Sequence, residues 1–264
     1  AGGAGLALAE WIVNGAPTRD LVEVDVRRFH THQANRRYLH ARTVEGLGRL
    51  YAMHWPHLQP TTARGIRRGP VYDRLVAARA AFGEQNAWER PMWFAPPGVA
   101  PLTEYSFGRQ NWFEHAAAEH RAAREAVALF ELSSFTKVEV AGPDALAVLQ
   151  SLSTRDVDVP VGRVVYTLLL THLGGIDLDG TITRLGDERF LVVTPTAFHT
   201  GTLSRLRRAC AGRQASVFDA TAALATLAVM GPRSRELLAR ITPDALGNDD
   251  FAWGTARTIE IAHG

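Results

Sequence analysis

The stretch VEVAGP at residues 138–143 decides the fold. Its apolar residues alternate as in a half-buried strand, and the Gly-Pro pair is typical of the start of a helix. The stretch LAVMGP at residues 227–232 repeats the pattern and again leads into leucine-rich sequence. We therefore predict an α+β fold with pseudo-duplicated β-α-β units that share one sheet system. Chance similarity of two βα units is the alternative.

Downstream of the first copy, the pattern favours strands at residues 164–170, 181–184 and 189–194, and a helix at 199–210. Gly174 and Gly175 predict a turn between the first two of these strands. The second copy begins with a strand predicted at 224–230.

Upstream, residues 2–14 predict a glycine turn that opens a helix, and further helices are expected at 35–54 and 114–128. Residues 56–113 between them are rich in proline, glycine, arginine and aromatic residues. So many aromatics argue against disorder. We expect an irregular segment packed onto a neighbour, with the aromatic residues of 88–94 buried.

Composition excludes several classes of protein. The 264 residues are 46% hydrophobic and 21% charged, with a net charge of +2, which gives no reason to expect nucleic acid or a membrane as partner. Cys210 is the single cysteine, which rules out an intrachain disulfide and fits a cytoplasmic location. The histidines lack metal-site spacing, and no G-x-S-x-G is present, so neither a metal site nor a serine hydrolase is expected. Lys137 is the single lysine.

Two motifs are candidates for chemistry. Asp177 and Asp179 follow the predicted glycine turn, and carboxylates at i and i+2 of a strand point the same way. Acidic residues in a turn are more often solvated turn formers. The glycines at 2, 3 and 5 precede a helix, where a backbone can approach a cofactor closely, although a plain turn is the simpler interpretation. From the residues alone, the chain is an α/β-type protein with one suggestive acidic turn.

Three further runs carry a resemblance to a known family. The runs FGE at 82–84 and WERPMWFA at 88–95, followed by SFGRQNWF at 106–113, resemble the dimethylglycine and sarcosine dehydrogenase family. From residue 140 onward the chain is similar to the glycine-cleavage T-protein, an aminomethyltransferase. The resemblance divides the chain into the end of an FAD-dependent oxidase domain (1–20), a central linker domain (21–104) and a truncated T-protein-like folate-binding domain (105–264). Because the chain starts at Ala1 and stops at residue 264, we expect a piece of a longer protein.

The resemblance implies an FAD-dependent enzyme that demethylates a small N-methyl amino acid of the dimethylglycine or sarcosine type and passes the one-carbon unit to tetrahydrofolate. It implies that Asp179 is the catalytic folate contact and that Tyr166 and Val193 line the same pocket. It also implies that Gly2, Gly3 and Gly5 form the last flavin-contacting turn. Homo-oligomerisation is left open.

Two departures weaken the resemblance at the site. Leu178 separates the two aspartates, which are adjacent in most T-proteins, and Pro195 stands where many have asparagine. A non-catalytic relative like the regulatory subunit of pyruvate dehydrogenase phosphatase is the alternative.

Overall fold

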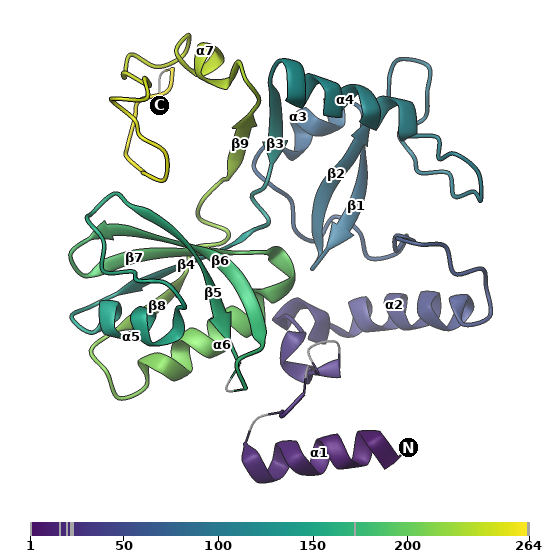
Figure 1. Cartoon of the computed structure of the whole chain (residues 1–264). Coiled ribbons are helices and arrows are strands. Elements are labelled where there is room, and N and C mark those ends of the chain that lie inside the picture. Colours follow the sequence, from purple (N-terminus) through teal and green to yellow (C-terminus); the bar gives the residue numbers. More distant parts are fainter. Residues whose placement is uncertain (1, 16, 20, 22–23, 172, 263–264) are drawn as a thin grey trace.

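The computed structural model describes residues 2–15, 17–19, 21, 24–171 and 173–262 (Figure 1). The α-helices are α1 (Gly2–Asn14), α2 (Arg36–Arg49), α3 (Tyr72–Ala77), α4 (Phe113–Glu125), α5 (Ala145–Leu152), α6 (His199–Cys210) and α7 (Ser234–Leu238). The strands are β1 (Ala80–Gln85), β2 (Trp88–Phe94), β3 (Ala128–Glu131), β4 (Thr136–Ala141), β5 (Val164–Leu170), β6 (Ile176–Gly186), β7 (Arg189–Thr194), β8 (Ser216–Asp219) and β9 (Leu227–Met230). Short 3₁₀ turns are η2 (Val26–Arg28), η3 (Thr31–Ala34) and η4 (Thr196–Phe198).

The centre of the fold is an antiparallel five-stranded sheet in the order β5-β6-β7-β4-β8. The helices α5 and α6 lie together beneath the sheet in Figure 1. Alternate residues of the strands, on one face of the sheet, pack against them. This face forms the main core, in which Val138 of β4 and Phe190 of β7 pack with Leu149 of α5 and Leu206 of α6. The other face of the sheet is turned away from these helices, and the candidate site residues lie on it.

The two Gly-Pro units have the same backbone geometry. Gly142 has a φ of 131° and Gly231 a φ of 124°, values that favour glycine. A Cβ added at Gly142 would lie 2.3 Å from the carbonyl oxygen of Gln214, and one added at Gly231 would lie 2.5 Å from that of Ala126. In both units, the Gly-Pro turn therefore packs against the residues just before the strand that pairs with the unit's own strand. That partner strand is β8 for β4 and β3 for β9.

The prediction that the two units share one sheet system is wrong. β4 lies inside the five-stranded sheet, whereas β9 pairs only with β3 in a separate two-stranded sheet. Within the described residues that follow α7, the structure assigns no further strand, so the second unit is βα and not β-α-β there. The pattern predicted the local unit correctly but not its long-range partner.

The segment 56–113 is more regular than predicted, because α3 and the β1–β2 hairpin lie within it. Asn86 and Ala87 make the hairpin turn with φ values of 50° and 65°. The burial prediction is confirmed for Trp88 and Trp93, which are 6% and 1% exposed, whereas Phe94 is only partly buried. Trp93 stacks on His115 of α4, with 5.5 Å between ring centroids. The aromatic residues thus pack within the hairpin and against its neighbouring helix.

The N-terminal segment differs from the prediction at two places. α1 already includes Gly2, so the glycines lie in the first turns of the helix and not in a turn before it. α2 ends at Arg49 instead of residue 54, and its start is capped by the Asn35 side chain, which accepts hydrogen bonds from the backbone N–H groups of Arg37 and Tyr38. Among the described residues, none of the helices is both long and apolar enough to cross a membrane.

The N-terminal segment meets the sheet domain through a cluster of histidines. The ring of His30 lies 4.9 Å from that of His199, the first residue of α6, and 5.6 Å from that of His32. His199 Nε2 lies 3.2 Å from Asp219 Oδ2 at the end of β8. Contacts between η2 and α6 extend the same joint.

Candidate folate-type site on the open sheet face

The strand register places the predicted site residues on one face of the sheet. Tyr166 of β5 is opposite Thr181 of β6, Thr181 is opposite Val193 of β7, and Val193 is opposite Lys137 of β4. Directly paired residues of an antiparallel sheet share a face. This row therefore crosses four strands on the face turned away from α5 and α6.

Asp179 joins this row beside Tyr166. Asp179 lies two residues before Thr181 on β6, so both side chains are on the same face, and the hydroxyl of Tyr166 donates a hydrogen bond of 3.0 Å to Asp179 Oδ2. Tyr166 is 54% exposed. The hydrogen bond to Asp179 raises the pKa of the Tyr166 phenol, with smaller contributions in the same direction from desolvation and from the carboxylate charge. An aromatic face and a carboxylate are thus presented together to solvent.

The location of the aspartates corrects the sequence interpretation. β6 begins at Ile176, so Asp177 and Asp179 lie in a strand and not in a turn. Leu169 pairs with Leu178 but Leu170 pairs with Ile176, which leaves Asp177 as the extra residue of a β-bulge.

The two carboxylates therefore do not act as a pair. Asp177 forms an ion pair with Arg205 of α6, the helix that packs on the other face of the sheet. Asp179 instead binds Tyr166 on the neighbouring strand. Nothing in the sequence pattern indicates the bulge or Arg205.

The opposite end of the row, at Lys137, is buried and almost inaccessible to solvent. Lys137 is 2% exposed, and its Nζ donates a hydrogen bond of 2.7 Å to the carbonyl oxygen of Ser133. Desolvation lowers the pKa of this amine, and the charges of Glu131 and Asp219 oppose the shift. Val193, next to it, is only partly buried. The accessible part of the row is the Tyr166–Asp179 end.

The glycines predicted to contact flavin lie apart from this site, in α1 (Figure 1). No described atom is within 4 Å of the Cβ that Gly2, Gly3 or Gly5 lacks. The described residues therefore form no flavin pocket around these glycines. The flavin contact of Gly2, Gly3 and Gly5 stays a prediction about a longer protein. Among the described residues, no group of three or more His, Cys, Asp or Glu side chains is arranged to hold a metal ion.

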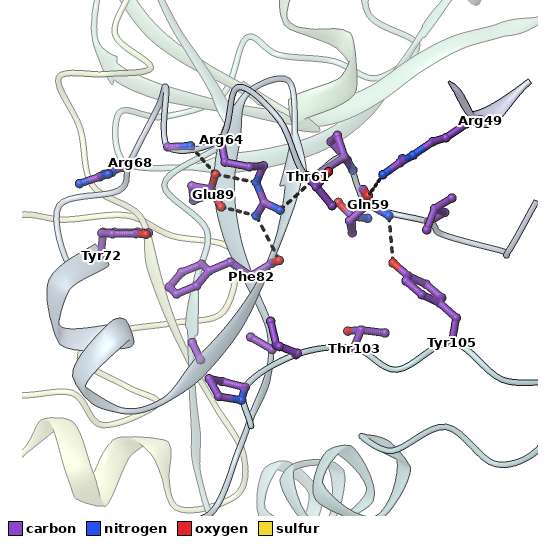
Figure 2. Close-up of a pocket in the computed structure, with 17 residues that line it drawn as sticks. Arg49, Gln59, Thr61, Arg64, Arg68, Tyr72, Phe82, Glu89, Thr103 and Tyr105 are labelled. Atoms are coloured by element: carbon purple, nitrogen blue, oxygen red, sulfur yellow. Dashed lines mark hydrogen bonds and ion pairs between the residues drawn. The ribbon is translucent and has the colours of Figure 1, made fainter. Parts of the chain in front are cut away.

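A cavity of about 560 Å³ lies elsewhere, between the loop around Arg64, strand β1 and the segment around Tyr105. Figure 2 shows that several of its polar groups bind one another. Arg64 Nε donates to Glu89 Oε1 at 2.9 Å, and the backbone N–H of Gln59 donates to the Tyr105 hydroxyl at 2.9 Å. Burial of Glu89 opposes its ionisation, but the bonds from Arg64 and Gly65 leave the net pKa lowered. We place the candidate site at Tyr166 and Asp179, where polar groups face outward, and regard this cavity as part of the scaffold.

The arrangement of sheet, Gly-Pro units and open-face site defines a T-protein-like α+β domain. The solved structure of the glycine cleavage system aminomethyltransferase T from Bartonella henselae has the same fold, with a TM-score of 0.53 and 24% identity over 67% of this chain and 44% of that one. Residues 71–264 match the GCVT N-terminal domain, so the chain belongs to this family. Residues 14–69 match the FAD dependent oxidoreductase central domain.

Curated relatives confirm the resemblance to the N-methyl amino acid oxidoreductases. The chain is 55% identical, over 99% of its length and 32% of the relative's, to the 4-methylaminobutanoate oxidase (formaldehyde-forming) of Paenarthrobacter nicotinovorans. It is 34% identical to the mitochondrial pyruvate dehydrogenase phosphatase regulatory subunit of Mus musculus, over 95% of this chain and 29% of that one. It is 30% identical to the mitochondrial sarcosine dehydrogenase of Homo sapiens, over 99% of this chain and 33% of that one. The chain thus spans about a third of these relatives.

Proposed function

We propose that this chain is the central and folate-binding part of an FAD-dependent enzyme that demethylates an N-methyl amino acid and passes the one-carbon unit to tetrahydrofolate. The observation that carries the proposal is the Tyr166–Asp179 pair, exposed on the open face of a T-protein-like sheet. The matches to the FAD dependent oxidoreductase central domain and to the GCVT N-terminal domain support the coupling of the two chemistries in one protein.

The pair fits a reduced folate. A carboxylate accepts a hydrogen bond from a folate amine and orients it for reaction, and it can take up the proton that the amine loses. Tyr166 fixes Asp179 through Oδ2 and offers its exposed ring to a flat pterin. FAD, when bound by the longer protein, supplies the two-electron acceptor for oxidation of the N-methyl group.

The substrate we propose is a small methylated amino acid whose amine lies several carbons from its carboxylate. The support is the 55% identity to a protein named for 4-methylaminobutanoate, against 30% to one named for sarcosine. The domain division at residues 20 and 104, a cytoplasmic location and homo-oligomerisation stay predictions.

The test compares two aspartate variants in the complete gene product. Losing a hydrogen bond to a charged group costs about 1.5–3 kcal/mol, or roughly ten- to a hundredfold. Asp179→Asn should therefore lower the yield of methylene-tetrahydrofolate by that factor and leave amine turnover almost unchanged. Asp177→Asn should have a much smaller effect, because Asp177 binds Arg205 and not Tyr166. The yield of methylene-tetrahydrofolate is measured beside amine turnover for both variants, and equal, small effects from both would favour the solvated-acid interpretation.

A non-catalytic role is the second candidate, because the similarity to the phosphatase regulatory subunit, at 34%, exceeds that to sarcosine dehydrogenase. Turnover decides between the two candidates. A complete gene product that binds flavin but oxidises neither 4-methylaminobutanoate nor sarcosine would support the regulatory role.

A further inference from the structure

The bulge in β6 is held by one side chain from the opposite face of the sheet. Arg205 of α6 uses Nη1 to bind Asp177, the bulge residue, and Nη2 to bind the carbonyl oxygen of Leu170 on β5. The two contacts fall on the two strands that lose register at this point. Because a guanidinium presents its donors in a fixed planar fork, these contacts lock the strands together at the bulge.

The locked bulge lies next to the candidate site. Asp179 follows Asp177 by two residues and is paired with Leu168, two residues before Leu170. Bulges bend a strand and change the direction of side chains near active sites. A change in the bulge therefore changes the position of the Asp179 carboxylate relative to Tyr166.

We propose that Arg205 is a positioning residue of the folate site, which keeps Asp179 beside Tyr166 and occupies Asp177 so that Asp179 is the carboxylate presented to the folate amine. This inference rests on the proposed function. Arg205 itself does not touch the ligand, because it reaches the strands from α6. Without Arg205, the Asp177 carboxylate loses its counter-ion two residues from Asp179, and the bulge loses its link to β5.

The expected effect is modest, because the side chains of Arg205 and Asp177 are 22% and 48% exposed. Exposed ion pairs contribute little, so we expect Arg205→Met to raise the Kd of 5-formyl-tetrahydrofolate by about two- to fivefold. The Kd is measured by titration calorimetry on the complete gene product. The kcat of amine oxidation with an artificial electron acceptor should stay at the wild-type value, whereas a general loss of structure would lower kcat as well as the affinity for 5-formyl-tetrahydrofolate.

Three further variants separate positioning from general destabilisation. Arg205→Lys keeps the charge but not the planar fork, so it should restore only part of the affinity. Arg208→Met removes an exposed arginine of the same helix and should leave the Kd unchanged. Arg205→Met combined with Asp177→Asn should bind no more weakly than Arg205→Met alone, because both changes break one interaction. If Arg205→Met does not fold, Arg205→Gln replaces it.

The outcomes distinguish this inference from the proposed function. Wild-type protein that does not bind 5-formyl-tetrahydrofolate overturns both. Wild-type protein that binds it, with an unchanged Kd in Arg205→Met or with effects that multiply in the double variant, overturns the role of Arg205 alone.

Discussion

Single residues set the geometry of the two Gly-Pro units. The backbone at Gly142 is in a region that residues with a Cβ rarely adopt, and the carbonyl oxygen of Gln214 lies only 2.3 Å from the position of the absent Cβ. Such a residue is required by the conformation and by the space at once. The repeated Gly-Pro pair in the sequence indicates the importance of this glycine, and the close approach of Gln214 is the physical reason.

Gly142→Ala should lower the free energy of unfolding by about 3 kcal/mol or more, because backbone strain of about 1–3 kcal/mol adds to a steric clash. Gly174→Ala is the matched control: Gly174 also has a positive φ, of 81°, but open space around its missing Cβ. Its cost should be about 1 kcal/mol. Urea unfolding of both variants measures the difference, and equal losses would show that the contact with Gln214 does not contribute.

At the candidate site, the resemblance to T-proteins identified Tyr166 and Asp179, and the structure brings both together. The sequence does not predict that Asp179 binds Tyr166 while Asp177 binds Arg205. This difference depends on the bulge at Asp177, and bulges arise from the fit between two strands and from a helix residue 28 positions away. The periodicity of one strand contains no such information.

Elements with regular periodicity were predicted well. The helix at His199–Cys210 and the strands at Val164–Leu170 and Arg189–Thr194 have the expected bounds. The β1–β2 hairpin was missed because its turn is Asn86-Ala87 instead of an Asn-Gly pair. Pro91 inside β2 also argues against a strand, and the pairing tolerates it only with a register shift between Ala81 and Phe82.

The hairpin depends on a buried ion pair. Glu89 of β2 is 4% exposed and accepts hydrogen bonds from Arg64 and from the backbone N–H of Gly65. Removing one partner of a buried pair leaves an uncompensated charge, at a cost of about 3–5 kcal/mol. Because Arg64 is partly exposed, Glu89→Gln should lower the free energy of unfolding by about 2–4 kcal/mol.

Tryptophan fluorescence during urea unfolding measures this loss, since Trp88 and Trp93 lie in the same hairpin. Glu114→Gln is the control, because Glu114 and its partner Arg109 are both about two-thirds exposed. Its effect should be within about 1 kcal/mol. A Glu89→Gln variant as stable as this control would contradict a structural role for the pair.

At the scale of the whole molecule, the N-terminal segment contacts α6 through the histidine cluster of His30, His32 and His199. Burial, followed by the charges of His199, Arg67 and His32, lowers the pKa of His30 from 6.5 to about 4, against a smaller opposing effect of Asp219. Burial likewise lowers the pKa of His32 and His199. Positive charge nearby lowers these pKa values further, from Arg67 and Arg42 for His32 and from Arg67 and Arg207 for His199. Negative charge raises them, from Glu84 for His32 and from Asp219 for His199.

The unfolded chain therefore binds more protons than the folded chain between pH 4 and 6.5, and the free energy of unfolding falls as pH decreases through this window. For His30 alone the loss is about 2–3 kcal/mol, allowing for partial exposure. His30→Phe keeps a ring in the joint but cannot be protonated, so it should reduce the fall in stability between pH 7 and 4. Urea midpoints at both pH values test this. An identical fall in wild type and variant would show that His30 is accessible to protons in the folded state.

The sequence could not place the two Gly-Pro units in separate sheets, because the choice of sheet partner depends on β3 and β8, which lie on either side of the first unit along the chain. Local pattern identifies a strand, while its neighbours are decided by contacts across about a hundred residues, as between Leu129 and Val229. Long-range pairing is thus the part of the fold that required the structure.

The burial of Lys137 has a consequence for chemical durability. Aldehydes react fastest with accessible primary amines, and this sequence contains one lysine. Its amine is enclosed and donates a hydrogen bond to the backbone of Ser133, so burial shields it although its lowered pKa favours the reactive neutral form. In the presence of formaldehyde, the lysine side chain of this chain is therefore protected from adduct formation and cross-linking. The same shielding makes the chain a poor target for amine-directed labelling.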